Sequence, residues 1–62
     1  MDDASADLRS SLDRLKGAQH AVIEDAARQL GLPSTAILRK IADLENTIAA
    51  VLALIEEREG SR

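Results

Sequence analysis

The clearest pattern in the chain is a series of aliphatic residues spaced alternately four and three positions apart in its C-terminal half. The members of this series are Ile37, Ile41, Leu44, Ile48, Val51 and Ile55. This spacing places side chains along one stripe of an α-helix, as in the seam of a coiled coil. Leu38 and Leu52 flank the stripe on one side and Leu54 on the other, which broadens it toward the apolar face of a helix in a bundle.

The N-terminal half repeats this spacing less regularly. Aliphatic residues recur at Leu8, Leu12, Leu15 and Val22, while Gln19 occupies a position of the same stripe. A polar residue in such a stripe either fixes the register of the packed helices or is merely tolerated, and the pattern leaves both interpretations open. Apolar and polar residues nowhere alternate over the length of a strand, so the sequence predicts an all-α protein.

Gly31 and Pro33 separate the two halves of the chain. Glycine readily adopts the left-handed conformation that ends a helix, and proline is accepted at the start of a helix. Ser34 and Thr35 can cap the helix that follows. We therefore predict a helix over about residues 4–30, a turn at 31–33 and a second helix over about 34–58, with Gly17 as a candidate break in the first helix.

The short length of the chain predicts that it associates. Residues 1–62 form one domain at most, and a chain of this size buries only ~60% of its unfolded surface. Small folds are usually held by a disulfide, a metal or an oligomer, and here there is no cysteine and one histidine. We therefore expect two long helices in an antiparallel hairpin, with hairpins pairing into a four-helix bundle. The expected oligomer interface is Leu8, Leu12, Leu15, Val22, Ile37, Ile41, Leu44, Ile48, Val51, Leu52 and Ile55.

Residues 26–41, about a quarter of the chain, support an alternative. The small pair Ala26 and Ala27, the turn at Gly31 and the apolar Ile37 and Ile41 have the spacing of a helix-turn-helix. In these residues the chain resembles the helix-turn-helix of Fis-type and IclR-type transcriptional regulators. The resemblance implies a three-helix fold with a long C-terminal dimerisation helix and a DNA-binding surface. Its DNA-binding residues would be Ser34, Thr35, Arg39 and Lys40.

Composition narrows the classes of function. The net charge is -3, acids and bases are interspersed, and no aromatic residue is present, which does not favour a nucleic-acid partner. His20 has no catalytic partner at a compatible spacing, and the glycines are too few for a phosphate-binding loop. We therefore expect no enzyme activity, cofactor or metal. The longest apolar run is too short for a membrane span and no secretory signal is present, so we expect a cytoplasmic protein.

These observations lead to a functional hypothesis and an alternative. The first is a non-enzymatic, homo-oligomeric helical module, such as a small adaptor, chaperone or regulator, which binds a second copy of itself and a protein partner. The alternative is a dimeric helix-turn-helix regulator that binds DNA. The two differ at Gly31, because a hairpin lays its helices antiparallel whereas a helix-turn-helix crosses them steeply.

Overall fold

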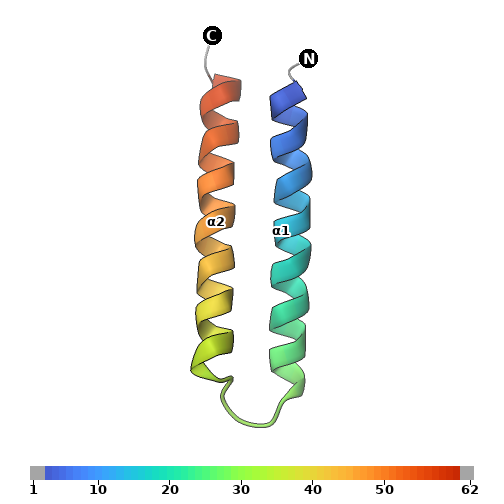
Figure 1. The fold of residues 1–62 in the computed structure, drawn as a ribbon, viewed down its shortest axis with the longest axis vertical. Helices are drawn as coiled ribbons and strands as arrows, with labels where there is room; N and C mark the ends of the chain where they lie inside the picture. The colour runs from blue at the N-terminus through green and yellow to red at the C-terminus, as the bar shows by residue number, and fades with distance from the viewer. Residues whose placement is uncertain (1–2, 61–62) are drawn as a thin grey trace.

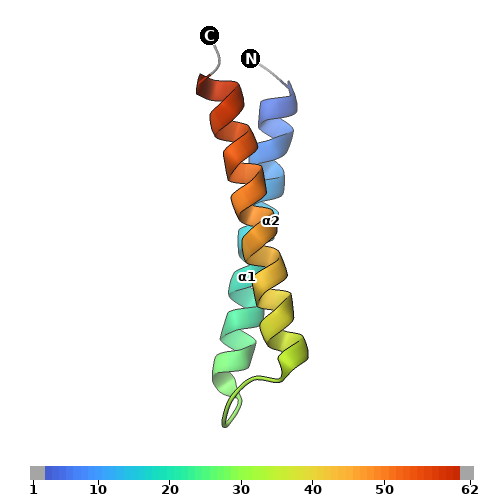
Figure 2. The ribbon, with the colours of Figure 1, turned by 90° about the vertical axis from the view of Figure 1, so that its left-hand side faces the viewer.

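The computed structural model describes residues 3–60, which form two α-helices joined by a short linker. Helix α1 spans Asp3–Arg28 and helix α2 spans Thr35–Gly60. The helices run antiparallel and stay side by side along their length, with the linker at one end of the molecule (Figure 1, Figure 2). The Cα extents of 49 × 15 × 13 Å describe a narrow rod. The predicted all-α helical hairpin is therefore confirmed.

The first helix ends earlier than predicted, at Arg28 rather than near residue 30. The backbone N–H of Gln29 donates to the carbonyl of Ala26 at 3.2 Å. This hydrogen bond spans three residues instead of the four of an α-helix, so the last turn is of the 3-10 type. Gly31 then has a φ of 85°, the left-handed conformation predicted for it. The turn is consequently longer than predicted and occupies residues 29–34.

Ser34, one of the two capping residues that the sequence predicted, caps the second helix. Its Oγ accepts a hydrogen bond from the backbone N–H of Ile37 at 3.2 Å, and its carbonyl accepts one from the N–H of Leu38 at 3.0 Å. A capping hydroxyl satisfies one of the N–H groups that have no partner in the first turn of a helix. Thr35 is therefore the first helical residue, and Pro33 lies in the linker instead of starting the helix.

Helix α1 continues through Gly17 without a break. A Cβ built on Gly17 would meet no atom within 4 Å, and the residue does not have a positive φ. Neither close packing nor an unusual backbone conformation therefore interrupts the helix at this point. Residues 3–60 accordingly contain two helices, and the three-helix arrangement considered as an alternative does not occur among them.

The core is a single line of aliphatic side chains between the helices. Leu12, Ile48 and Ile55 form a buried cluster, and the partly buried residues that pack against it are Leu8, Leu15 and Val51. Ala26 is also buried, near the linker end. Two helices share only one line of contact, so the edges of their apolar stripes remain open to solvent.

Candidate interaction surface

The residues predicted to form an oligomer interface lie mainly along the contact between the two helices of one chain. The three in the buried cluster are Leu12, Ile48 and Ile55, with Leu8, Leu15 and Val51 packed against them. The remaining partly buried members are Val22, Ile37, Ile41 and Leu44, whereas Leu52 is exposed. One helix pair thus covers the centre of the apolar stripe and leaves its margins accessible.

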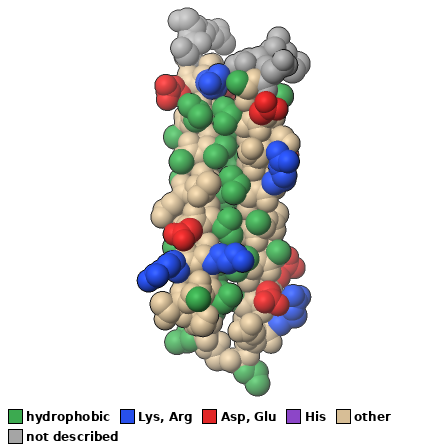
Figure 3. Space-filling model, viewed as in Figure 1, with side chains coloured by type: hydrophobic (Ala, Val, Ile, Leu, Met, Phe, Trp, Pro, Cys, Tyr) green, Lys and Arg blue, Asp and Glu red, His purple; other side chains and the backbone are tan. Residues whose placement is uncertain are grey.

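One margin opens into a shallow groove of about 420 Å³ between the helices, lined by Ser11, Arg14, Leu15 and Val51. Residues three, four or seven positions away lie on the same side of a helix, so the side of the hairpin that carries the groove can be followed along both helices. We define the groove face as Ser11, Leu15, Ala18 and Val22 of α1 with Leu44, Thr47, Val51 and Leu54 of α2. Hydrophobic side chains gather along the groove between the helices in Figure 3.

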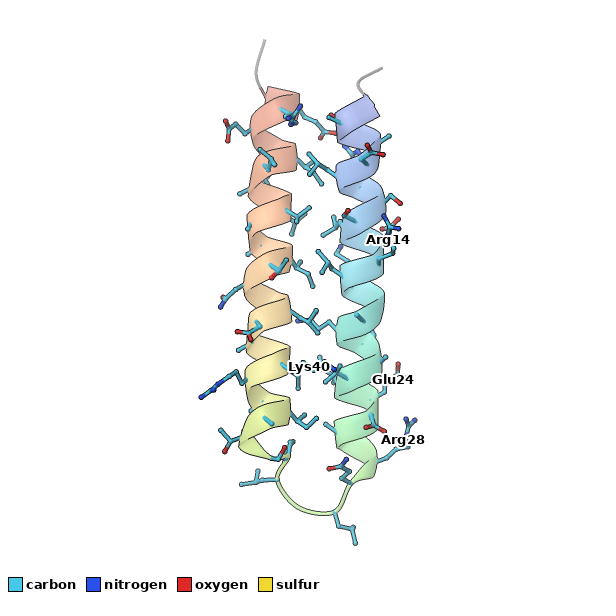
Figure 4. The ribbon with its side chains drawn as sticks, viewed as in Figure 1. Arg14, Glu24, Arg28 and Lys40 are labelled. Atoms are coloured by element: carbon cyan, nitrogen blue, oxygen red, sulfur yellow. The ribbon has the colours of Figure 1, made fainter. Side chains whose placement is uncertain are left out.

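The polar residues of the groove face interrupt it little. The hydroxyl of Thr47 donates to the carbonyl of Asp43 at 2.8 Å, so its hydrogen-bonding demand is met within its own helix. Leu54 keeps 39% of its surface exposed. In Figure 4, Lys40 lies between the helices toward the linker end, and Arg14, which lines the groove, lies at the outer edge of α1. Charged groups therefore frame an aliphatic strip.

The opposite margin carries polar links that join the helices directly, beside exposed leucines. Arg9 of α1 forms an ion pair with Glu59 of α2. Gln19 Nε2 donates a hydrogen bond to Glu45 Oε2 at 2.6 Å, so Gln19 links the two helices rather than being merely tolerated. Glu45 and Glu59 belong to a series of α2 residues that are spaced by seven and so lie on one side of the helix. We call this side the bridged face and define it as Leu38, Glu45, Leu52 and Glu59.

Leu52 and Leu54 therefore lie on different faces. Leu52 is seven residues before Glu59 and belongs to the bridged face, and its place in an oligomer interface stays a prediction. Leu54 is three residues after Val51 and belongs to the groove face, but it was predicted only to flank the stripe. The sequence does indicate on which side Leu54 lies, because Leu52 and Leu54 are about 200° apart around a helix and so flank the stripe on opposite sides.

The residues named for DNA binding lie at the start of α2. The hydroxyl of Ser34 accepts the capping hydrogen bond, and Thr35, Arg39 and Lys40 are exposed. Arg39 and Lys40 are consecutive, so their side chains project about 100° apart around the helix. Helix α2 continues from these residues antiparallel to α1 instead of crossing it steeply (Figure 2). The fold thus directs Lys40 toward the groove face and Arg39 away from it.

Residues 3–60 were also compared with the requirements of a membrane-spanning helix and of a metal site. No helix there is long and apolar enough to cross a membrane, and no three side chains of the metal-binding types are grouped to hold an ion. His20 is exposed. Comparison of the chain with protein-family models, curated proteins and solved structures finds no match. The groove face is therefore the feature from which we infer a function.

Proposed function

We propose that the chain is a non-enzymatic, homo-oligomeric interaction module whose groove face is covered by a second hairpin in a four-helix bundle. The supporting observation is that the packing of one helix on the other buries only part of the aliphatic stripe. Among residues 3–60 the buried hydrophobic side chains are Leu12, Ala26, Ile48 and Ile55. Leu15, Val22, Leu44 and Val51 stay partly exposed along the groove. A second apolar helix pair would complete their burial.

The dimensions of the hairpin suit such a pairing. The two larger Cα extents, 49 and 15 Å, multiply to a projected face of roughly 700 Å². This is close to the ~800 Å² that each partner buries in a protein interface of standard size. Apolar burial contributes about 25 cal/mol per Å², a substantial gain for a chain whose core is one line of side chains. Self-association would thereby supply the stability that so small a fold lacks.

The bridged face supports a second part of the proposal, the binding of a protein partner. Leu38 of the bridged face is 51% exposed. Ile23 of α1, four residues after Gln19 and so on the same side of the hairpin, is 43% exposed. Both are more exposed than Leu54 on the groove face, at 39%. In a bundle assembled through the groove face, the bridged face of each hairpin stays accessible. The module would then act as a small adaptor, chaperone or regulator.

Two leucines of nearly equal exposure provide a matched test of the groove face. Leu54 is 39% exposed on the groove face and Leu52 is 36% exposed on the bridged face. We expect Leu54→Glu to reduce the mass from that of an assembly to one 6.7 kDa chain, because it places a carboxylate in the apolar interface. Leu52→Glu should leave the assembly unchanged. Light scattering behind a sizing column, at micromolar concentration, measures both masses.

Circular dichroism on the same samples shows whether each variant keeps its helices. A well-folded wild-type monomer at micromolar concentration would overturn the proposal of self-association. Equal dissociation by Leu54→Glu and Leu52→Glu would contradict the choice of the groove face.

A further inference from the structure

The links on the bridged face set the level of each residue along the rod. The side-chain contacts place Arg9 near the level of Glu59 and Gln19 near the level of Glu45. The two contacts are 10 residues apart on α1 and 14 on α2, so they define each level to about one helical turn. Moving toward the linker, Asp25 is six residues beyond Gln19 and Lys40 is five residues beyond Glu45. Moving the other way, Asp7 and Arg58 lie within two residues of Arg9 and Glu59. Asp25 and Lys40 therefore share one level near the linker, and Asp7 and Arg58 share another at the far end.

The charges at these levels differ in sign between the two helices. Lys40 is four residues before Leu44 and Arg58 four residues after Leu54, so both basic residues border the groove face on α2. Asp7 is four residues before Ser11 and Asp25 is seven after Ala18, so both acidic residues border it on α1. At both levels, a basic edge on one helix accompanies an acidic edge on the other.

We propose that two hairpins pair through their groove faces with both linkers at the same end, about a two-fold axis parallel to the helices. This inference rests on the proposed function. The rotation lays α2 of one copy against α1 of the second copy at the same level. Lys40 then faces Asp25 of the second copy, and Arg58 faces Asp7 of the second copy. Each contact occurs twice because the interface is symmetric.

The opposite arrangement, with the linkers at opposite ends, brings like charges together. It lays α2 against an inverted α2 and α1 against an inverted α1. Ala49 is midway between Lys40 and Arg58, so with a two-fold axis at the level of Ala49 each of them would face the other residue of the second copy. Asp7 would face Asp25 in the same way. Such contacts of like charge disfavour an association and help to select its orientation.

Other charged residues near the groove face reduce the difference between the two orientations but do not remove it. Asp25 already pairs with Arg28 within its own helix at 3.4 Å, but both side chains remain well exposed. Arg58 likewise already has an interaction partner within the chain, which reduces its attraction for Asp7 of the second copy. Asp43 stands one helical turn from Lys40 and lies near Asp25 of the second copy, which reduces the attraction there. Arg39 and Glu57 are turned about 100° from Lys40 and Arg58, away from the groove. Arg14 lines the groove near the level of Val51; with linkers at the same end it meets the uncharged positions around Val51 of the second copy, whereas the opposite arrangement brings the two copies of Arg14 close together. The charges nearest the groove thus favour linkers at the same end.

Charge reversal at Lys40 distinguishes the two orientations by the sign of its effect. We expect Lys40→Glu to raise the dissociation constant of the dimer roughly ten-fold, because two attractive contacts become repulsive. Arg39→Glu is the matched control, since it changes the net charge equally on the outer side of the helix. Combining Lys40→Glu with Asp25→Lys should restore most of the affinity. Sedimentation equilibrium at low salt measures all four proteins.

A distance measurement tests the orientation independently. The chain has no cysteine, so Leu32→Cys, at a linker position that is 94% exposed, accepts a single spin label. Pulsed electron resonance on the labelled dimer should give a distance far below 49 Å, the length of the rod. A distance near that length would overturn the orientation, as would tighter association of Lys40→Glu or an effect equal to that of Arg39→Glu. A wild-type monomer would instead overturn the proposed self-association itself.

Discussion

Ile48 lies at the centre of the narrow core. It is 5% exposed and belongs to the buried cluster with Leu12 and Ile55. A core made of one line of side chains has few neighbouring groups that can move to compensate for a lost contact. The hairpin should therefore be more sensitive to a change at Ile48 than at the residues beside it in the sequence.

A pair of adjacent substitutions tests this dependence at the residue scale. Ile48→Asp should destabilise the fold by roughly 4 kcal/mol or more, because a carboxylate without a partner would enter the apolar cluster. Ala49→Asp introduces the same side chain at the next, exposed position and should retain the helices. Circular dichroism with urea unfolding compares the variants. Unchanged helicity of Ile48→Asp would show that Ile48 does not lie in the core.

At the scale of the elements, two glycines have opposite roles. Gly17 is inside α1, where glycine is a poor helix former, whereas Gly31 has a φ of 85° in the linker. A Cβ at either position would meet no atom within 4 Å. Backbone conformation alone should therefore determine the effect of an alanine at each site.

Gly17→Ala should stabilise the protein by about 0.5–1 kcal/mol, because alanine loses less backbone entropy when the helix forms. Gly31→Ala should destabilise it by roughly 1–2 kcal/mol, because a Cβ is unfavourable in the left-handed conformation. Urea unfolding of both variants at one fixed protein concentration gives the comparison. A destabilising Gly17→Ala would mean that α1 needs flexibility at this position.

At the scale of the whole molecule, stability should depend on protein concentration. An assembly that binds only folded chains shifts the unfolding equilibrium by mass action. We expect the melting temperature of the wild type to rise with concentration, whereas that of Leu54→Glu should stay constant and lower. Thermal melts followed by circular dichroism from micromolar to submillimolar concentration measure this. A melting temperature of the wild type that does not change with protein concentration would contradict the proposed bundle.

The candidate surface could be predicted from the sequence only in part. The stripe from Ile37 to Ile55 is regular enough to identify a helix that packs along one side. Periodicity does not say whether the partner is the other half of the same chain or another copy. The buried cluster of Leu12, Ile48 and Ile55 shows that the first cover comes from the same chain. The groove face is the part of the apolar stripe that stays accessible after α1 and α2 have packed together.

The sequence by itself determined the features that depend on neighbouring residues: two helices, the reversal at Gly31, a cap at Ser34 or Thr35 and the apolar stripe. These follow from backbone preferences and helical spacing, which act within a few residues. The tertiary structure decided the features that depend on how the helices are rotated against each other. That rotation links Gln19 to Glu45 and opens the groove beside Leu15 and Val51, because it determines which margin of each stripe meets the other helix.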